Sequence, residues 1–469
     1  MNTPVYDFVN KYKTGGSVRL HMPGHKGMGG LGCEKLDITE IAGADELYDA
    51  EGIIAEAEDN TSKLYGSGRT LWSAEGSSQC IRAMLYLAVY GIKNTSGERP
   101  VILAARNVHK AFLYGCALLD IHAEWIYPAI SSGSICGSPV TADDVAVAID
   151  RLDSLPAAVY ITSPDYLGAM ADIKGISEAC HQRGVILIVD NAHGAYLNFL
   201  PESLHPLSLG ADMCSDSAHK TLPVLTGGAY LHISVSAPAG LRERAKQAMA
   251  LFGSTSPSYL IMQSLDLCNR YIADGYRERL EQFIERLDSL RNRLRSYGWQ
   301  LYPSDPLRLT VSSDAISGHE LAERLRRDYN IEAEYADSRY AVLMLTIENQ
   351  ADLGCIDEAF KLIGQDLQGR PALEQGRPLP YPVCPVRMSI REAILSDYEE
   401  VSPRKALGRI CAAPAVACPP AIPIVVSGEE ITALASDWFI SCGINKVLVV
   451  KQADNGRLKL LEEIAKMTV

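Results

Sequence analysis

The chain has 469 residues, with 44 Lys and Arg against 57 Asp and Glu, so its formal net charge at pH 7 is −13. Hydrophobic residues make up 47% and charged residues 22%, a globular composition that excludes a disordered, collagen-like or coiled-coil chain. The acidic balance argues against nucleic acid or an anionic membrane as a partner, because both attract basic surfaces, and the length allows two or three domains.

The first 75 residues show little periodicity, whereas from residue 76 onward short apolar runs alternate with helical patterns. A largely buried helix is expected to start at Ser77-Ser78. Beyond it we expect, in order, a strand at 101–106, a helix at 109–120, a helix at 141–155, a strand at 157–164, a helix at 171–184 and a strand at 185–190. Apolar strands separated by helices indicate βαβ units, so we predict an α/β fold with a large, mainly parallel sheet covered on both faces.

The sequence of the second half of the chain predicts an organisation different from that of the large sheet. Residues 240–297 are expected to be helical, and strands and helices alternate again over 300–364, which indicates a small α+β domain. The proline-rich stretch 375–385 is typical of a boundary. The expected domains are an N-terminal arm (1–40), a large cofactor-binding domain (41–255), a helical linker with the small domain (256–375) and a C-terminal segment (376–469).

Nine of the ten histidines lie in the first 232 residues, and several follow predicted strands. His109 comes after the strand at 101–106, Asp190 ends a strand with His193 three residues later, and His219-Lys220 follow the stretch ADMCSDSA. An α/β sheet binds its ligands beyond the carboxyl ends of its strands. These side chains are therefore expected to meet in one site.

The residue types suit one cofactor. A lysine can form a Schiff base, and the Gly76-Ser77-Ser78 turn at a helix N-terminus offers N–H groups and hydroxyls to a phosphate. Asp190 could hold a proton on a pyridine nitrogen, and the planar His109 could stack on the ring. These are the parts of a pyridoxal phosphate site, and their order along the chain suits an aspartate-aminotransferase-type fold (fold type I).

No metal site is predicted. His21 and His25 are separated by Pro23 and Gly24, which forbid the helix that would align them, and no third ligand is evident. The twelve cysteines form no C-x-x-C pair and indicate core thiols in a reducing compartment. With neither a secretory signal nor an apolar stretch of membrane-spanning length, the sequence predicts a cytoplasmic enzyme.

Longer motifs carry a family resemblance. They are RLHMPGHKG (19–27), DITEIAGADELYDAEGII (37–54), the Gly76-Ser77-Ser78 turn, RNVHKA (106–111), TSPDYLGAMADI (162–173), VDNAHGAY (189–196), SDSAHKTLPVLTGGAYLH (215–232), GSTSPSYLIMQSLD (253–266), VSPRKALGRI (401–410) and CPPAIPIVVSGEEI (418–431). In these elements the chain resembles the Orn/Lys/Arg decarboxylase family of pyridoxal-phosphate enzymes, in its short form. The resemblance implies decarboxylation of arginine, lysine or ornithine to the corresponding amine and CO₂, as in polyamine biosynthesis.

The resemblance also implies roles for individual residues. Lys220 would hold the cofactor through a Schiff base, Asp190 would pair with the ring nitrogen, His109 would stack on the ring and His193 would lie beside the phenolic oxygen. The residues expected at the phosphate are Gly76, Ser77, Ser78, Ser217 and His219. Thr255 and Ser256 would reach the site from the partner in a homodimer, or a higher homo-oligomer, with active sites between subunits. The candidates on the substrate side are His25, Asp45, Glu46 and Glu334.

The chain departs from the family pattern at several positions. It has Asn191 where the family usually has glutamate, Ala111 in place of a serine, and Gly227 in place of a glutamine. These changes leave open a pyridoxal-phosphate-dependent aminotransferase, or other Schiff-base chemistry on an amino acid. The third hypothesis is a catalytically silent paralogue that binds a ligand or a partner. The presence of Lys220, Asp190 and His109 argues against it, because a silent copy would not need these residues. Because HMPGHKG starts at residue 21, assemblies built through an extra N-terminal domain are not expected.

Overall fold

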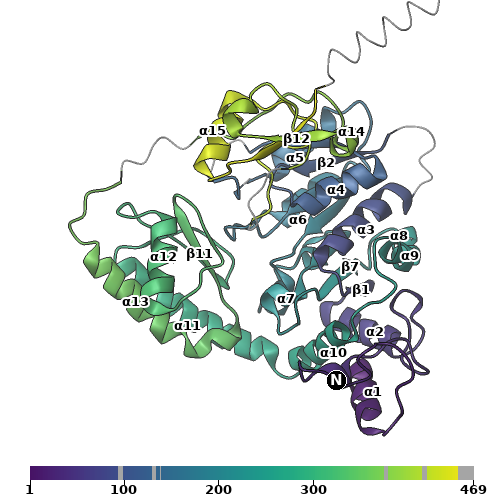
Figure 1. Cartoon of the computed structure of the whole chain (residues 1–469). Helices are drawn as coiled ribbons and strands as arrows, with labels where there is room; N and C mark the ends of the chain where they lie inside the picture. Colours follow the sequence, from purple (N-terminus) through teal and green to yellow (C-terminus); the bar gives the residue numbers. More distant parts are fainter. Residues whose placement is uncertain (93–98, 129–133, 138, 374–378, 415–419, 453–469) are drawn as a thin grey trace, which may run out of the picture.

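The protein is described by a computed structural model that covers residues 1–92, 99–128, 134–137, 139–373, 379–414 and 420–452. Three sheets organise these residues: one of seven strands, one of four and one of two. Figure 1 shows the large sheet with its helices on one side of the molecule, the four-stranded sheet on the other, and the C-terminal segment above both. In the described part of the chain, no helix is both long and apolar enough to cross a bilayer.

The large sheet has the strand order β1-β7-β6-β5-β4-β2-β3 and is mainly parallel, as predicted. Strands β6, β5, β4, β2 and β3 run parallel, whereas β7 pairs antiparallel with both β1 and β6. The strands are β1 (Arg69–Ser73), β2 (Val101–Ala105), β3 (His122–Ile126), β4 (Ala158–Thr162), β5 (Ile186–Asp190), β6 (Met213–Asp216) and β7 (Ala229–Ile233).

Helices cover both faces of this sheet, which explains its apolar strands. In β2, Ile102 and Ala104 pack in one core cluster with α3 and α4, and Leu103 and Ala105 pack in another with α5 and α6. Consecutive strand residues point to opposite faces, so every position is buried when both faces are covered. The helices around the sheet are α3 (Ser77–Tyr90), α4 (Lys110–Leu119), α5 (Ala142–Asp150), α6 (Ile173–His181), α8 (Ala239–Glu243) and α9 (Ala245–Leu251).

The N-terminal 75 residues contain more regular structure than the sequence predicted. Helices α1 (Pro4–Thr14) and α2 (Ile53–Tyr65) pack on each other and on α10 (Tyr259–Ala273), with two 3₁₀ turns, η1 (Glu34–Leu36) and η2 (Leu47–Asp49), between them. Helix α2 buries Glu58, Asn60 and Thr61, so polar residues interrupt the apolar pattern of its inward face. Its polar groups find partners only in the folded protein, among them Lys246, whose Nζ lies 2.8 Å from Glu58.

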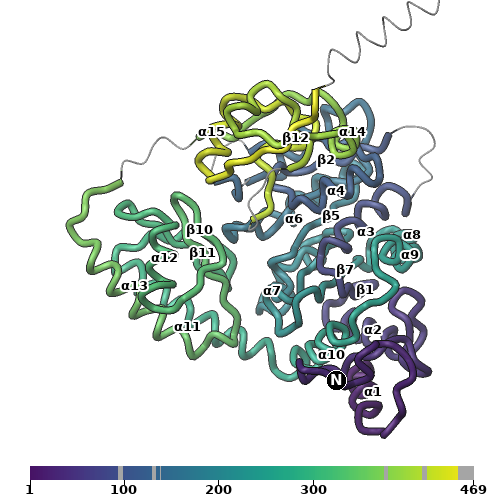
Figure 2. The backbone as a smooth tube through the Cα atoms, viewed as in Figure 1, coloured from purple at the N-terminus to yellow at the C-terminus, as the bar shows by residue number. Residues whose placement is uncertain are grey.

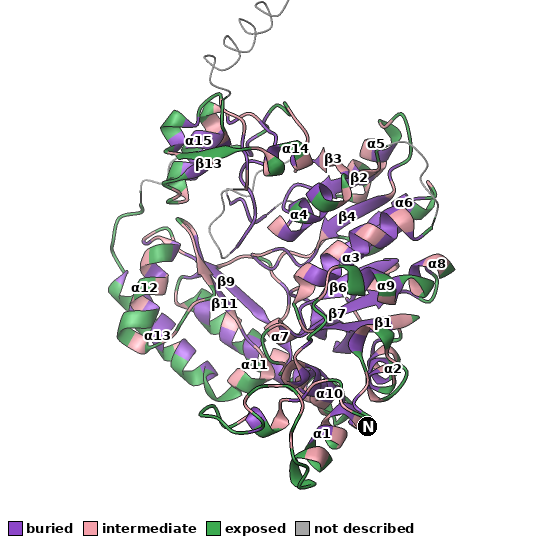
Figure 3. Ribbon diagram, turned by 45° about the vertical axis from the view of Figure 1, so that its right-hand side comes forward, coloured by how far each residue is buried: buried purple, intermediate pink, exposed green. Residues whose placement is uncertain are grey.

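The four-stranded sheet has the order β10-β11-β9-β8 and is antiparallel. Helix α11 (Tyr276–Ser296) lies along it and buries an apolar stripe that includes Leu280, Leu287 and Leu294, while its charged face points to solvent (Figure 3). The remaining elements of this unit are β8 (Gln300–Leu301), β9 (Arg308–Ser312), α12 (Gly318–Tyr329), β10 (Tyr335–Ala336), β11 (Tyr340–Met344), η5 (Ile347–Ala351) and α13 (Leu353–Asp366).

The C-terminal segment packs against the large sheet domain, although the two are far apart along the chain (Figure 2). Helix α14 contacts α4, and Arg106, just beyond β2, forms an ion pair of 2.9 Å with Glu429 in which both side chains are almost completely buried. The elements of this segment are α14 (Ile390–Leu395), β12 (Tyr398–Val401), η6 (Pro403–Lys405), α15 (Ala433–Ser441) and β13 (Val447–Val450).

Candidate active site

A cavity of about 240 Å³ opens beyond the carboxyl ends of the parallel strands. Asn107 and His109 follow β2, Thr162 ends β4 and Asp190 ends β5, so neighbouring strands supply its floor. The complete lining is Ser77, Asn107, His109, Thr162, Pro164, Tyr166, Asp190, Ala192, His193, Lys220, Glu334, Pro420, Ala421 and Ile422. The sequence prediction that strand ends bring His109, Asp190, His193 and Lys220 together agrees with this arrangement.

Lys220 enters the cavity from α7 (Ala218–Thr221), a single turn that follows β6. Its Nζ lies 2.8 Å from Nε2 of His193. The other ring nitrogen of His193, Nδ1, accepts a hydrogen bond of 2.8 Å from Nη2 of Arg308, the first residue of β9. Burial, reinforced by the charges of Lys220 and Arg308, lowers the pKa of His193 well below its usual value. The imidazole therefore stays neutral beside the lysine.

Asp190 is the buried carboxylate of the cavity. One oxygen accepts a hydrogen bond from the Tyr160 hydroxyl (3.1 Å) and the other from the backbone N–H of Ala192 (3.2 Å). Burial raises the pKa of Asp190, and the positive charge of Lys220 opposes that shift. A carboxylate in this position can hold a cationic N–H that enters the cavity, since a buried charge needs a partner of opposite sign.

His109 is the N-cap of α4, where its Nδ1 accepts a hydrogen bond of 3.1 Å from the backbone N–H of Ala111. This contact leaves Nε2 as the protonated nitrogen and fixes the plane of the ring at the cavity. Burial, followed by the charges of Lys220 and Lys110, lowers the pKa of His109 to about 4.

This shift predicts a pH dependence of stability. Between pH 6.5 and about 4 the unfolded chain protonates His109 and the folded chain does not, so stability falls as the pH falls. The contribution is roughly 3 kcal/mol over that window, at 1.36 kcal/mol per pKa unit. Urea unfolding without added cofactor should therefore depend less on pH in His109→Gln than in the wild type. The same slope in both proteins would contradict the assignment, and His319→Gln, at an exposed position of α12, serves as the control.

The end of the cavity at α3 is suited to a phosphate. Gly76 is the N-cap of the helix, with φ 75°, and as a glycine it has no side chain to cap the first turn. Ser217 Oγ donates to Ser77 Oγ at 2.8 Å, so two hydroxyls meet beside the positive end of the helix dipole. Ser78 continues the first turn of α3, and His219 Nδ1 donates to the carbonyl of Gly228 (2.9 Å).

Unpaired polar atoms show that the cavity is built for a polar ligand. Asn107 Oδ1 and Thr162 Oγ1 are buried and have no hydrogen-bond partner among the described residues, although both residues line the cavity. Buried polar groups are normally paired, so their partners are expected on a bound molecule. With Lys220, Asp190 and the hydroxyls at α3, this set of donors and acceptors fits pyridoxal phosphate.

On the open side of the cavity, Glu334 lies at its junction with a second cavity of about 490 Å³. Tyr166 donates its hydroxyl proton to Glu334 at 2.5 Å. Burial, together with this contact, raises the pKa of Tyr166. Of the four candidates on the substrate side, Glu334 is the one that the structure brings to the cavity.

The other predicted site residues lie elsewhere in this chain. His25 pairs with Asp37 (3.2 Å), and Asp45 accepts backbone N–H groups, including those of Gly52 and Ile54, at the start of α2. Glu46 is exposed, and so are Thr255 and Ser256 in the loop before α10. None of the five belongs to the lining described above.

The sequence did not single out Arg308, Tyr166, Asn107 or Thr162. Asn107, Thr162 and Tyr166 lie inside the family motifs 106–111 and 162–173, so the resemblance could have identified them. Arg308 lies outside every motif that carries the resemblance. The C-terminal wall, residues 420–422, was also missed. Lys110 holds it through a hydrogen bond of 3.1 Å from its backbone N–H to the carbonyl of Ala421.

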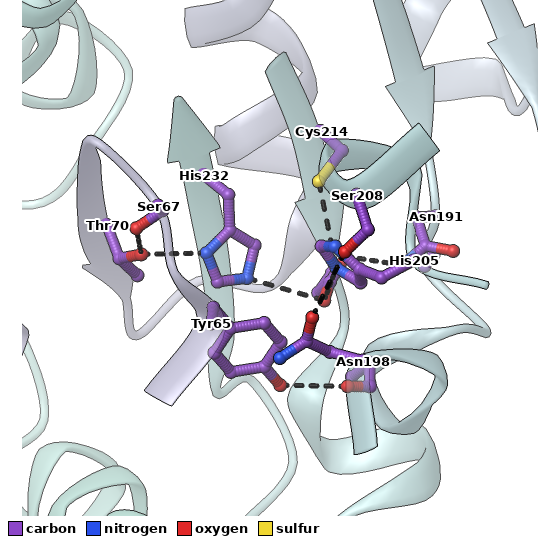
Figure 4. A network of polar contacts seen from close by, with 12 residues as sticks. Tyr65, Ser67, Thr70, Asn191, Asn198, His205, Ser208, Cys214 and His232 are labelled. Carbon is purple, nitrogen blue, oxygen red and sulfur yellow. Dashed lines mark hydrogen bonds and ion pairs between the residues drawn. The ribbon is translucent and has the colours of Figure 1, made fainter. Parts of the chain in front are cut away.

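A buried polar network supports the strand that leads to Lys220 (Figure 4). Oδ2 of Asp216 lies 3.0 Å from Nε2 of His205 and 3.3 Å from Nε2 of His232, and Asn191 donates to Oδ1 at 2.7 Å. Although burial opposes it, the two histidines hold the pKa of Asp216 below its usual range. A glutamate at 191 would set a second carboxylate against Asp216, which accounts physically for the asparagine.

Comparison with known proteins agrees with this site. The chain matches the family model described as "Orn/Lys/Arg decarboxylase, major domain" over residues 3–316. It is 29% identical over 490 residues to the Bacillus subtilis (strain 168) "Uncharacterized protein YaaO", covering 99% of this chain and 98% of that protein. It is 28% identical to the arginine decarboxylase of the same organism, covering 92% of this chain and 91% of that protein.

Solved structures share the fold. The lysine decarboxylase LdcF of Francisella novicida superposes with a TM-score of 0.79 at 16% identity, over 96% of this chain and 81% of that chain. Serine palmitoyltransferase of Sphingomonas wittichii superposes with a TM-score of 0.52 at 15% identity, over 68% of this chain and 77% of that chain. The predicted fold type I architecture is therefore confirmed. Because the family model spans more than half of the chain, the protein belongs to the Orn/Lys/Arg decarboxylase family and is a pyridoxal-phosphate-dependent amino-acid decarboxylase.

Proposed function

We propose that this enzyme decarboxylates a basic amino acid, arginine, lysine or ornithine, to the corresponding amine and CO₂. The observation that carries the proposal is Glu334, a carboxylate on the open side of the cavity that also contains Lys220. A carboxylate there suits a substrate with a cationic end. The similarity to the arginine decarboxylase of Bacillus subtilis supports the same substrate class.

The chain's own residues supply the cofactor's contacts. Lys220 would hold pyridoxal phosphate covalently, and Asp190 would hold the proton on its ring nitrogen. His109 would stack on the ring, and His193 would donate to the phenolic oxygen. The phosphate contacts would come from Gly76, Ser77, Ser78, Ser217 and His219.

When bound, pyridoxal phosphate supplies an electron sink for the electron pair left by the departing CO₂. The protein controls the protons around that event. Asp190 would be ionised opposite a cationic N–H of the cofactor, and Lys220 and His193, 2.8 Å apart, would deliver a proton to the substrate carbon. Residues 420–422, which line the cavity, would help to exclude water from it.

The substrate's distal cation would bind Glu334, held in place by the Tyr166 hydroxyl. The adjoining cavity beyond Glu334 carries further acidic side chains, Glu323 and Glu332, which attract the same charge. These acidic side chains would therefore let the negative net charge of the chain contribute to substrate binding. Asp45 is committed to backbone contacts, and Glu46 and His25 would act on the substrate only from a partner subunit.

We further propose a homodimer, or a higher homo-oligomer, in the cytoplasm, acting in polyamine biosynthesis. The N-terminal arm exposes Val18, Leu20, Met22, Met28 and Leu31, each at least 68% accessible, which is unfavourable unless another surface covers them. A second copy of the chain that covered the arm would also contribute Thr255 and Ser256 across the interface. Sedimentation analysis of the full chain tests this proposal, and a monomer would refute it.

The reaction is tested by offering arginine, lysine, ornithine and neutral amino acids to the purified enzyme and measuring CO₂ and amine. Release of CO₂ from a basic amino acid is expected. Formation of a keto acid without CO₂ would instead indicate the aminotransferase alternative. A protein that binds the cofactor and turns over none of these substrates would support the silent paralogue.

Glu334→Gln should raise the KM for the basic amino acid about 10- to 100-fold with a smaller change in kcat, because a charge-assisted hydrogen bond is worth about 1.5–3 kcal/mol. Steady-state kinetics of CO₂ release measure this change. The matched control is Glu358→Gln, an exposed carboxylate of α13 that lines neither cavity, which should leave KM close to that of the wild type. An unchanged KM in Glu334→Gln would place the cation elsewhere.

A further inference from the structure

We propose that Arg308 is a positioning residue that dictates which nitrogen of His193 carries the proton and thereby keeps the Lys220 amine in its neutral, nucleophilic form. Arg308 is only 2% exposed and comes from β9, in the four-stranded sheet rather than the large one. The inference rests on the role proposed for Lys220, and it assigns a function to a residue that the sequence motifs did not indicate.

Every contact of the Arg308 guanidinium in the described structure is to an acceptor. Nη1 donates to the carbonyls of Asp165 (2.8 Å) and Tyr166 (2.9 Å), and Nε lies 3.2 Å from a carboxylate oxygen of Asp305. Nη2 donates to Nδ1 of His193 at 2.8 Å. A guanidinium has five donors and no acceptor, and it does not lose its proton in proteins.

This chemistry leaves His193 one tautomer. Since Arg308 can only donate, Nδ1 must offer its lone pair, and the ring proton must sit on Nε2. The opposite tautomer would set two N–H groups against each other at 2.8 Å. A doubly protonated ring is excluded by the same clash, and burial, with the charge of Arg308, lowers the pKa of His193 in the same sense.

The fixed tautomer acts on Lys220. Nε2–H of His193 points to Nζ at 2.8 Å, so the lysine must accept that hydrogen bond. An ammonium group has three donors and no lone pair, and only the neutral amine can accept. The neutral amine is also the form that attacks a carbonyl carbon. Arg308 therefore selects the reactive state of Lys220 through the His193 ring, without touching the lysine.

Contacts from both sheets fix the position of the Arg308 guanidinium. Tyr196 fixes Asp305 by donating to Oδ1 (2.5 Å), and Asp305 in turn faces the guanidinium. The carbonyls of Asp165 and Tyr166 lie in the loop after β4, in the large sheet domain. The guanidinium thus joins the two sheets at His193, and the tautomer depends on their packing.

The direct test is magic-angle-spinning NMR of full-length protein labelled with ¹⁵N-histidine, with His193→Asn to assign the signals. We expect a protonated Nε2 and an unprotonated Nδ1 for His193, both with and without bound cofactor. A protonated Nδ1, or an imidazolium at neutral pH, would overturn the proposal. The result does not depend on which amino acid is the substrate, so the failure of the proposed function would be recognised separately.

A second test follows the rate at which Lys220 takes up pyridoxal phosphate, measured by absorbance as a function of pH. Arg308→Gln introduces an amide that can accept as well as donate, so it no longer dictates the tautomer. We expect its uptake at neutral pH to be about tenfold slower than in the wild type, with the midpoint of the profile about one pH unit higher. Arg308→Lys, which can only donate, should restore most of the wild-type profile.

Arg291→Gln is the matched control for a structural role. Arg291 donates to the carbonyls of Asp305, Pro306 and Arg308, so it supports the same segment without contacting His193. It should leave the pH midpoint in place even if stability falls. Equal shifts in Arg291→Gln and Arg308→Gln would overturn the proposal, as would a wild-type profile in Arg308→Gln. Should Arg308→Gln fail to fold, the NMR result on the wild type decides.

Discussion

Replacing Lys220 by alanine is expected to abolish CO₂ release, with a loss on the order of 10⁴-fold or more, as found when a covalent catalyst is removed. The side chain enters the cavity within 2.8 Å of His193, and Lys220 is the one lysine that lines this cavity. The purified variant should also lose the yellow colour of the bound cofactor. Absorbance spectra and CO₂ release from arginine, lysine and ornithine measure both effects.

The control is Lys174→Ala, at an exposed position of α6, which should remain yellow and active. A coloured, active Lys220→Ala would show that another lysine holds the cofactor. A wild-type protein that gains no absorbance when the cofactor is added would refute the assignment of the whole cavity, not only of this residue.

Glu429→Gln is expected to cost about 3–5 kcal/mol of stability, because it leaves the Arg106 guanidinium as an unpaired buried charge. The two side chains are 0% and 1% exposed and 2.9 Å apart, and Glu429 also accepts from the backbone N–H of Val426 (2.7 Å). Arg106 in turn donates to the carbonyls of Pro423 and Ile424. These contacts hold the C-terminal wall of the cavity, so the variant should also lose activity.

The neighbouring Glu430 provides the matched control. It pairs with Arg387 at 2.8 Å on the surface, where such a pair is worth about 0–1 kcal/mol, so Glu430→Gln should unfold nearly as the wild type does. Urea unfolding and hydrogen exchange over residues 420–430 measure the two variants. The double replacement of Arg106 and Glu429 by methionine should recover most of the stability, because no buried charge remains. Equal stability of Glu429→Gln and Glu430→Gln would contradict the role of the buried pair.

Sequence patterns predicted the large sheet well and the N-terminal region poorly. The strands β2, β4 and β5 are continuous apolar runs because helices cover both faces, and such runs are visible in the sequence. Helix α2 escaped prediction because it buries polar side chains, and the partner of Glu58 is Lys246, far away along the chain. The antiparallel direction of β7 was also beyond prediction, since residue types do not encode strand direction.

The residues of the candidate site also fall into two groups, those that the sequence predicted and those that it did not. His109, Asp190, His193 and Lys220 could be predicted because each follows or ends a strand, and parallel strands bring their carboxyl ends to one edge of a sheet. Arg308 could not, because an arginine at the start of a strand gives no sign that its guanidinium will reach a histidine of another sheet. His25, Asp45 and Glu46 lie outside the cavity in this chain, and their proposed roles depend on a partner subunit.

The sequence by itself determined the family, the cofactor and the fold class of this protein, since these depend on motifs in which neighbouring residues act together. Only the tertiary structure determined which side chains control the protonation states and the geometry of the site. The tautomer of His193, the neutral state of Lys220 and the anchoring of the cavity wall by Arg106 and Glu429 all depend on contacts between segments more than a hundred residues apart. Such contacts form only when the sheets pack, because packing removes water and leaves each buried donor and acceptor with a single partner.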